Sequence, residues 1–284
     1  MSKTLRQVAS GVAKRMAIRM GMKPTMTSMH ISSDATVEQR LLAALTMLRI
    51  RRGDSRELET LYRAFVLPGL RPREGRDDDL SQLIGTTVGE ALYIAFHLQE
   101  AIPNGGDICE FGVAQGATSR FLAREIAHTD RTLWLFDSFE GLPKPSKEDE
   151  LIDDIFRLGS MAAYAGTMRS PREEVESRLR AIAFPPHRVR VKPGWIDKTI
   201  TEEPLPERVA FAYVDFDFHD PIRLALEWLD GRMPAGGAIV VDDYGFFSKG
   251  AQTAVDAFVA ARPARWRFAM SHPAAGHFCV LTRT

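Results

Sequence analysis

The sequence lacks three features that would each define a class of protein. It has only two cysteines, Cys109 and Cys279, so a disulfide framework and a cysteine zinc cluster are excluded. No apolar run approaches the roughly 18 residues that a membrane-spanning helix requires. Neither charge sign is in excess, because 37 Lys and Arg balance 37 Asp and Glu. A general nucleic-acid binder is therefore not expected, whereas the 45% hydrophobic content is enough for a core.

The first 33 residues carry unbalanced positive charge. They contain Lys and Arg but no Asp or Glu, and their apolar residues recur at helical spacing, which predicts a basic amphipathic helix. Such a helix suits a membrane surface, a transit signal or a partner subunit. Its apolar face is short and lacks Trp and Phe, so docking on its own domain or on a second copy is favoured. No signal-peptide pattern is present, and we expect a cytoplasmic homodimer or higher homo-oligomer.

A domain boundary is expected near residue 80. A second helical pattern covers residues 37–65, and residues 67–79 are rich in Pro, Gly, Arg and Asp. We therefore divide the chain into an N-terminal helical extension, 1–80, and a main domain, 81–284. The extension is expected to cover the acceptor pocket or to pair subunits.

The main domain alternates short apolar runs with amphipathic helices. Seven runs are expected to be strands: 108–111, 132–136, 189–191, 209–214, 238–241, 265–270 and 277–281. Helices are expected over 87–101, 118–128, 171–183, 222–229 and 252–261. This alternation predicts an α/β protein with a Rossmann-like, doubly wound, mostly parallel sheet. The last two runs are too close for a crossover helix, so they are expected to form an antiparallel hairpin.

The first predicted strand ends in a glycine-bearing turn. Glu110, Gly112 and Gly116 follow the spacing ExGxxxG, and Ser119 lies at the start of the next helix. The glycines permit a sharp turn and the close approach of a ligand. A dinucleotide pyrophosphate requires a third glycine, which disfavours a nicotinamide oxidoreductase. The Glu110 carboxylate suits a cation, and S-adenosylmethionine carries a sulfonium and an ammonium but no phosphate.

The ends of the second and third strands fit the nucleoside part of that ligand. Asp137 ends the second strand, where an acid accepts hydrogen bonds from ribose hydroxyls, and Ser138 follows it. Trp195 follows the third strand, and it either lies against adenine or packs in the core.

Acidic residues follow the fourth and fifth strands. Asp215, Asp242 and Asp243 should converge, because the ends of neighbouring parallel strands meet at one edge of the sheet. Carboxylates at that density raise one another's pKa unless a cation neutralises them, and Mg²⁺ prefers oxygen ligands. We therefore predict that these three residues hold Mg²⁺. The sequence pattern favours a helix-capping or loop-holding role for Asp217 and Asp220.

Five segments resemble successive blocks of one enzyme family. They are DICEFGVAQGATSRFLA, LWLFDSFEGLP, VKPGW, VDFDF and GAIVVDDYGFFSKGAQTAVDAF. They are similar to the TylF-type macrocin O-methyltransferases, which act on hydroxyls of sugars in natural products, and the resemblance spans residues 87–262. Its main departure is DFDFHDP in place of DGDxYES after the fourth strand, so acceptor contacts there are expected to differ.

The resemblance implies a class I methyltransferase fold with a seven-stranded sheet, and the use of S-adenosylmethionine and Mg²⁺. It implies roles for seven residues: Glu110, Gly112 and Gly116 in the glycine block, Asp137 at the ribose, and Asp215, Asp242 and Asp243 at the metal.

The predicted function is O-methylation of a small-molecule hydroxyl, most simply on a sugar. Coordination to Mg²⁺ would polarise and place the hydroxyl, and Asp215 or His219 would take its proton. A lone histidine near a helix start is otherwise structural. The alternatives are a phenolic or catechol-like acceptor, and a non-catalytic partner protein that binds the cofactor.

Overall fold

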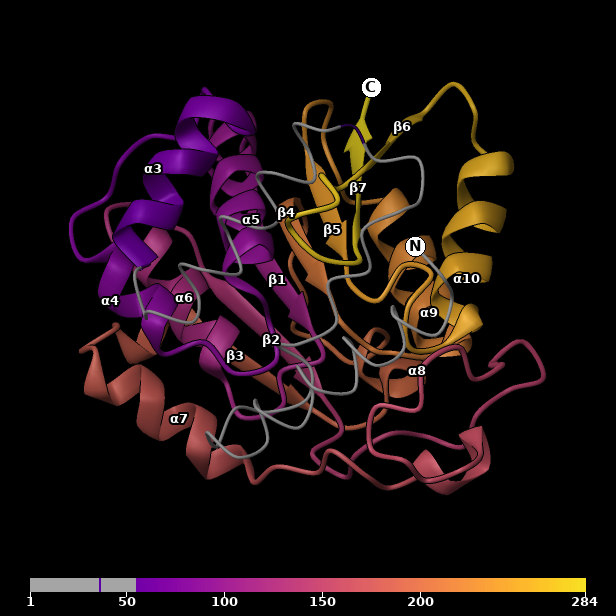
Figure 1. Ribbon diagram of the computed structural model, residues 1–284. Coiled ribbons are helices and arrows are strands. Elements are labelled where there is room, and N and C mark those ends of the chain that lie inside the picture. The colour runs from indigo at the N-terminus through magenta and orange to yellow at the C-terminus, as the bar shows by residue number, and fades with distance from the viewer. Residues whose placement is uncertain (1–35, 37–54) are drawn as a thin grey trace.

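A seven-stranded sheet forms the centre of the molecule in a computed structural model that describes Thr36 and residues 55–284 (Figure 1). The strands are β1 (Asp107–Phe111), β2 (Leu133–Asp137), β3 (Val189–Pro193), β4 (Val209–Val214), β5 (Ala238–Val241), β6 (Trp266–Met270) and β7 (Cys279–Arg283). Their order is β3-β2-β1-β4-β5-β7-β6. The first five pair in parallel, and β7 pairs antiparallel with β5 and β6. The seven predicted strands and the C-terminal antiparallel hairpin are confirmed.

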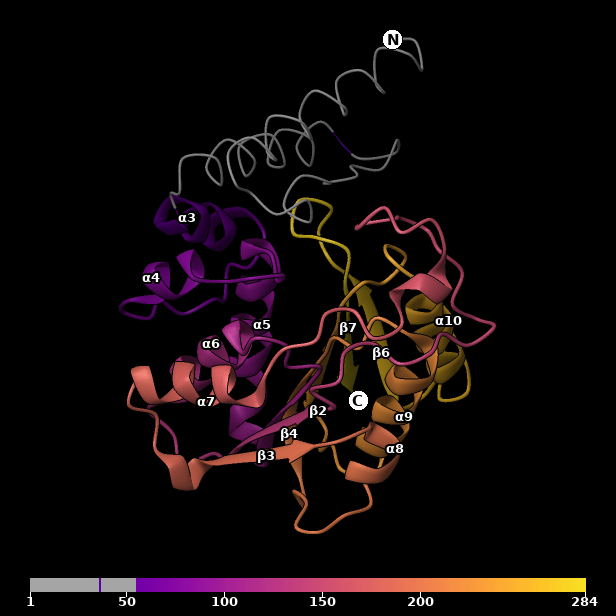
Figure 2. The same ribbon diagram turned by 90° about the horizontal axis from the view of Figure 1, so that it is seen from below.

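Helices cover both faces of the sheet (Figures 1 and 2). One face carries α5 (Val88–Ala101), α6 (Ala117–Glu125) and α7 (Arg172–Ala181), and the other carries α8 (Ile196–Thr199), α9 (His219–Asp230) and α10 (Lys249–Ala260). Because both faces are covered, the central strands are continuously apolar rather than alternating. β4 and β5 are buried at every position. The helices predicted between strands are confirmed.

The described part of the predicted extension packs against the main domain. It contains α3 (Ser55–Phe65) and α4 (Arg76–Ser81). Leu58 and Tyr62 of α3 share an apolar cluster with Leu92 of α5. Arg76 of α4 forms a buried ion pair with Glu125 of α6, with 2.8 Å between Nε and Oε1. Residues 67–79 are thus packed rather than a linker, while the division at residue 80 stays a prediction.

Residues 142–168, between β2 and α7, form what we call the cover segment. It runs past the carboxyl end of the sheet, beside α9 and α10, and its regular structure is the short turn η3 (Met161–Tyr164) (Figures 1 and 2). An apolar cluster anchors it, in which Leu142, Met161 and Tyr164 pack with Phe218 and Phe247. The cover segment is therefore a docked part of the fold.

Three predictions concern residues or properties outside the described structure. The basic helix predicted within residues 1–33 lies outside the described residues. Within the described ranges, no helix combines the length and apolar character needed to cross a bilayer. The cytoplasmic location and the homo-oligomer stay predictions.

Candidate functional site

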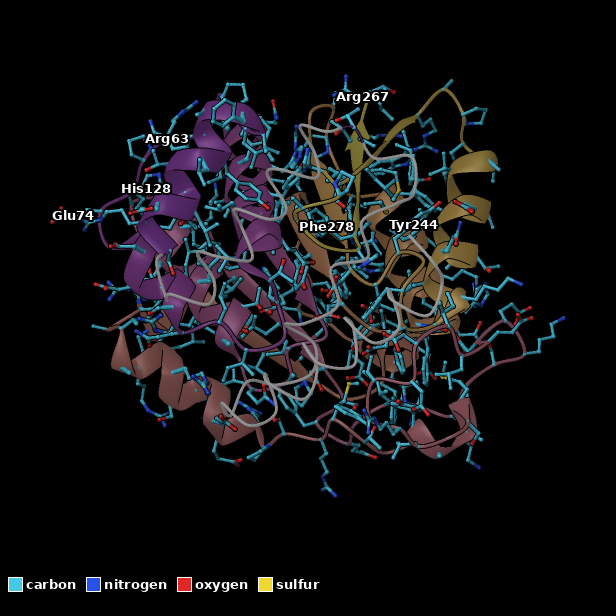
Figure 3. The ribbon with its side chains drawn as sticks, in the orientation of Figure 1. Arg63, Glu74, His128, Tyr244, Arg267 and Phe278 are labelled. Atoms are coloured by element: carbon cyan, nitrogen blue, oxygen red, sulfur yellow. The ribbon has the colours of Figure 1, made fainter. Side chains whose placement is uncertain are left out.

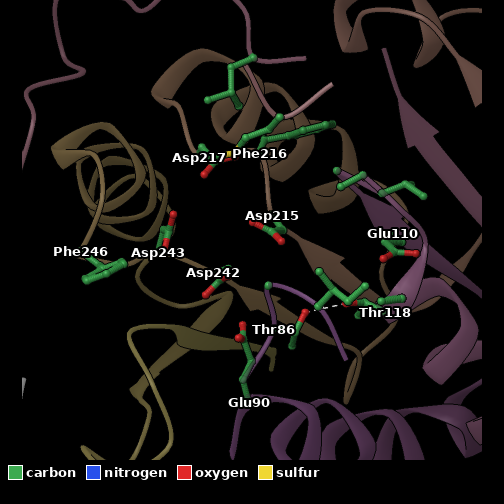
Figure 4. Close-up of a pocket in the computed structure, with 18 of the residues that line it drawn as sticks. Thr86, Glu90, Glu110, Thr118, Asp215, Phe216, Asp217, Asp242, Asp243 and Phe246 are labelled. Atoms are coloured by element: carbon green, nitrogen blue, oxygen red, sulfur yellow. Dashed lines mark hydrogen bonds between the residues drawn. The ribbon is translucent and has the colours of Figure 1, made fainter. Parts of the chain in front are cut away.

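A cavity of about 500 Å³ lies at the carboxyl end of the sheet (Figure 4). Its volume falls within the range of small-molecule sites. The loops that follow β1 to β5 line it together with the cover segment. The residues predicted from the sequence that line it are Glu110, Gly112, Asp137, Ser138, Trp195, Asp215, Asp242 and Asp243. The fold thus brings most of the predicted site together.

Two glycines shape the loop between β1 and α6. Gly112 has a φ of +85°, and a Cβ there would lie 1.8 Å from the carbonyl oxygen of Asp215. Gly116 has a φ of +77°, and its Cβ would lie 2.9 Å from the Cα of Val175. Only glycine fits these positions without displacing backbone. Gly112 lines the cavity, whereas Gly116 supports the loop from outside it.

Glu110 is a buried carboxylate with an unsatisfied oxygen. Its Oε2 accepts a hydrogen bond from the Ser119 hydroxyl, and its Oε1 has no partner. Burial raises the pKa of Glu110 to about 8, the charge of Asp137 adds to this rise, and the Ser119 hydrogen bond opposes it. A buried acceptor left unpaired is costly, so the position fits a ligand that supplies a donor or a positive charge. Ser119 acts through Glu110, since it does not line the cavity.

Asp137 holds the glycine-bearing loop. Its carboxylate accepts hydrogen bonds from the backbone N–H groups of Val113 (2.7 Å), Ala114 (3.0 Å) and Phe139 (2.6 Å). A carboxylate offers about four acceptor positions, so roughly one remains for a ribose hydroxyl. Asp137 therefore has a structural task that its strand-end position does not reveal.

Ser138 and Trp195 occupy the wall on the same side of the cavity. The Ser138 hydroxyl donates to the carbonyl of Gly141 at 3.3 Å. Trp195 is half-buried, and its side chain lies in the cavity wall. Of the two interpretations of Trp195, the cavity position favours contact with a ligand.

Four aspartates from two neighbouring loops face the cavity (Figure 4). Asp215 and Asp217 follow β4, and Asp242 and Asp243 follow β5. The Tyr213 hydroxyl lies 3.3 Å from a carboxylate oxygen of Asp215 and 3.3 Å from one of Asp242. Asp215 and Asp242, which follow the ends of β4 and β5, therefore both lie beside the Tyr213 hydroxyl.

Glu90 of α5 lies beneath these aspartates. Its carboxylate is 2% exposed and stands 3.2 Å from the same Tyr213 hydroxyl. Burial raises the pKa of Glu90 well above its usual range, and the negative charge of Asp242 adds to this rise. Glu90 is not recognisable as a site residue from the sequence, because a glutamate within a predicted helix carries no signal that it faces a cavity.

The aspartates raise one another's pKa. Burial is the largest cause for Asp215, followed by the charges of Asp242 and Asp243. The pKa values of Asp217 and Asp243 are also raised, first by burial and then by neighbouring carboxylates. Such a cluster is relieved by bound protons or by a cation.

The chemistry of this donor set fits a hard cation, which binds carboxylate oxygens. The side chains lie in pairs, with Asp217 beside Asp243 and Asp242 beside Glu90. Across the described ranges, no three acidic, histidine or cysteine side chains are spaced as a ready-made metal site. Mg²⁺ bound by Asp215, Asp242 and Asp243 therefore stays a prediction.

Asp217 lies in the cavity wall, although the sequence pattern favours a capping role for it. Its φ of +62° turns the chain, and the N–H of Phe218 donates to the carbonyl of Phe216 at 2.6 Å. This tight turn places the Asp217 carboxylate beside Asp243. The two-residue spacing from Asp215 gives no such signal, because the chain turns at Asp217 instead of continuing as a strand.

His219 lies at the start of α9 and does not line the cavity. Its Nδ1 is 3.0 Å from Oδ1 of Asp220, and its backbone N–H donates to Asp149 at 2.8 Å. The geometry therefore favours the aspartates over His219 as the group that takes a proton from a bound hydroxyl.

The model of the macrocin O-methyltransferase (TylF) family matches residues 89–266, from α5 to the start of β6. The chain belongs to this family. The 8-demethyl-8-(2,3-dimethoxy-alpha-L-rhamnosyl)-tetracenomycin-C 4'-O-methyltransferase of Streptomyces olivaceus is 33% identical over 150 residues, which cover 52% of this chain and 55% of that protein. The mycinamicin III 3''-O-methyltransferase of Micromonospora griseorubida is 30% identical over 151 residues, covering 52% and 58%. The chain thus matches these TylF relatives over about half of their length.

The TylF assignment agrees with the fold. The structure of the O-methyltransferase NovP superposes with a TM-score of 0.60 at 22% identity, covering 87% of this chain and 99% of that one. At this identity the likeness concerns the fold alone. The class I methyltransferase fold implied by the sequence resemblance is confirmed.

Proposed function

We propose that this TylF-family protein transfers a methyl group from S-adenosylmethionine to a hydroxyl of a sugar in a small natural product. The observation that carries the proposal is the placement of Glu110, with its unpaired buried oxygen, and four aspartates in one cavity. The name of the 33% identical relative specifies a rhamnosyl compound as its substrate, which supports a sugar as the acceptor.

The donor side of the cavity consists of the loop after β1, Asp137 and Ser138 at the end of β2, and Trp195 after β3. When bound, S-adenosylmethionine supplies a methyl group that is already electrophilic. Glu110 would pair with its cationic part, the remaining acceptor position of Asp137 would take a ribose hydroxyl, and Trp195 would contact adenine. Gly112 lets the backbone approach the ligand without a side chain in the way.

The acidic side must place the acceptor oxygen and remove its proton. As the oxygen–carbon bond forms and the carbon–sulfur bond breaks, the hydroxyl proton passes to a carboxylate, for which Asp215 and Asp217 are positioned. Alignment supplies much of the acceleration, since effective molarities of well-placed groups reach about 10⁵ M or more. Mg²⁺ held by Asp215, Asp242 and Asp243 would supply Lewis acidity at the same place.

The acceptor side also has an apolar wall. Phe216 and Pro221, two of the departures from the family pattern, line the cavity with Phe156 and Phe246. Phe156 is 45% exposed, so it offers apolar surface to an incoming ligand. An acceptor sugar attached to an apolar carrier fits this combination of acids and apolar side chains.

Asp215→Asn and Asp242→Asn test the proposal in assays with and without a chelator. Each change should reduce methylation of a sugar acceptor by about 100-fold, because a placed negative charge is lost. Binding of S-adenosylhomocysteine, measured by calorimetry, should change by no more than about twofold. Asp220→Asn, at an exposed aspartate outside the cavity, is the matched control.

Two outcomes would contradict this assignment. Full activity in both variants and after metal removal would show that the acids take no part in the reaction. A large loss of S-adenosylhomocysteine binding would show that they hold the nucleoside instead.

A further inference from the structure

A buried carboxylate, Asp149, ties the cover segment to the rest of the site. It is 6% exposed. Its Oδ2 accepts hydrogen bonds from the backbone N–H and the hydroxyl of Ser146, both at 2.8 Å. Its Oδ1 accepts from the backbone N–H of His219 at 2.8 Å and from the hydroxyl of Ser248 at 3.0 Å. The four donors use the acceptor capacity of the carboxylate, so Asp149 is a saturated junction.

The two partners of Oδ1 stand at helix starts. Phe218, at the N-cap of α9, has no side chain that can accept a hydrogen bond, and Asp149 takes this role from 70 residues earlier in the chain. Ser248 caps α10 by accepting from the N–H of Gly250 at 2.9 Å, and it donates to Asp149. Two helix N-termini therefore stabilise the negative charge of one carboxylate.

Backbone hydrogen bonds on the C-terminal side of Asp149 hold the cover segment against the start of α10. The N–H of Ile152 donates to the carbonyl of Phe247 at 3.0 Å, and the N–H of Lys249 donates to the carbonyl of Glu150 at 2.9 Å. A Cβ on Gly250 would lie 1.8 Å from Oδ1 of Asp149. The cover segment and the start of α10 are thus fitted closely around this side chain.

The position of the junction links two walls of the cavity. Helix α9 follows the loop of Asp215 and Asp217, and α10 follows the loop of Asp242 and Asp243. The cover segment supplies apolar side chains to the cavity wall, namely Leu142, Pro143, Ile155, Phe156 and Met168. Asp149 joins the apolar wall to both acidic loops.

We propose that Asp149 is a positioning residue, which sets the apolar wall that contacts the acceptor relative to the carboxylates that take its proton. The inference rests on the proposed function of the site. Asp149 makes no hydrogen bond to Glu110, to Asp137 or to the loop between β1 and α6. Acceptor use should therefore depend on Asp149, whereas donor binding should not.

Three variants separate this role from a general loss of structure. Asp149→Ala removes all four hydrogen bonds. Asp149→Asn retains an oxygen for His219 and Ser248, and its amide N–H can donate to the Ser146 hydroxyl, so only the Ser146 N–H loses its acceptor. Glu150→Gln is the matched control, since it removes a negative charge from the neighbouring residue. The exposed ion pair of Glu150 with Lys249 contributes little to stability.

Asp149→Ala should lower kcat/KM for the sugar acceptor by about 10- to 100-fold, the loss expected from misplacing reacting groups. In this variant kcat should fall and the KM for the acceptor should rise, while the Kd of S-adenosylhomocysteine stays within about twofold of the wild-type value. Asp149→Asn should recover most of the activity, and Glu150→Gln should match the wild type. Hydrogen exchange should become faster in the cover segment and at His219 in Asp149→Ala.

The proposal is overturned if folded Asp149→Ala keeps wild-type kcat/KM, if donor binding weakens as much as acceptor use, or if Asp149→Asn is as damaged as Asp149→Ala. Should Asp149→Ala fail to fold, Asp149→Asn and Ser248→Ala test the proposal instead. Each must show a smaller fall in kcat/KM for the acceptor, again with unchanged binding of S-adenosylhomocysteine. If the wild type methylates no sugar, the proposed function fails by itself. Exchange and S-adenosylhomocysteine binding in the same variants then still test whether Asp149 holds the two walls together.

Discussion

Glu110 shows how one buried side chain prepares the cavity for a charged ligand. Its Oε1 has no partner, and burial raises its pKa to about 8. In the free protein the carboxyl group is therefore largely protonated near pH 7. Binding of a positively charged ligand favours the ionised form, so binding and proton release should be coupled.

The affinity for S-adenosylmethionine should rise with pH and level off above about pH 8. Below that pH, Glu110 must lose a proton before it can pair with the cation, so affinity should fall by up to about tenfold per pH unit. Calorimetry at about pH 7, in buffers of different ionisation enthalpy, should detect the released proton. Glu110→Gln should bind more weakly and without this pH dependence.

A rise in pH that strengthens ligand binding through Glu110 should weaken the stability of the unliganded protein. The pKa of Glu110 is about 8 in the folded protein, against 4.5 for an ordinary glutamate, so the native state holds an extra proton between these pH values. Stability of the unliganded protein should therefore decrease as pH rises through this range. For the binding prediction, an affinity of the wild type for S-adenosylmethionine that stays constant from about pH 6 to pH 9 would contradict the role given to Glu110.

Among the structural elements, the turns after the strands position the chemistry. The loop after β5 carries Tyr244 (Figure 3). Its hydroxyl donates to Asp256 of α10 at 2.6 Å, and its ring packs against Phe268. The loop after β1 is held by Asp137 and bent by Gly112. Each loop is thus fixed by contacts from an element other than its own strand.

Gly112→Ala should destabilise the protein more than Gly75→Ala. Both positions have positive φ, +85° and +72°, which costs about 1 to 2 kcal/mol for a residue with a Cβ. The Cβ at position 112 would also strike the backbone of Asp215, whereas position 75 has nothing within 4 Å. Urea unfolding should show an additional loss of about 1 kcal/mol or more for Gly112→Ala. Equal losses in the two variants would disprove the close contact between the loops after β1 and β4.

For the whole molecule, a zero net charge conceals a strongly acidic cavity. Seven carboxylates line it: Glu90, Glu110, Asp137, Asp215, Asp217, Asp242 and Asp243. No lysine or arginine of the described part of the chain is among the lining residues. Recognition of a phosphate group usually relies on arginine or lysine side chains, so this environment is unfavourable for a nucleotide-linked sugar.

Under the proposed function, the protein should therefore prefer a sugar on an uncharged apolar carrier to the same sugar on a nucleoside diphosphate. We expect kcat/KM to be about 10-fold higher or more for the uncharged glycoside. Repulsion by the carboxylates and the loss of hydration both oppose binding of the diphosphate. Matched acceptors with the same sugar, assayed at two ionic strengths, measure this difference. Equal or better use of the nucleotide-linked sugar would contradict it.

The sequence by itself determined the strands, the glycine-bearing turn and the strand-end acids Glu110, Asp215, Asp242 and Asp243. Apolar runs and chain order suffice for these features, because the ends of neighbouring parallel strands must share an edge. The tertiary structure alone decided which groups surround Asp149 and Glu90. Each depends on partners more than 60 residues away, at His219 and Tyr213, and no local pattern records such a contact.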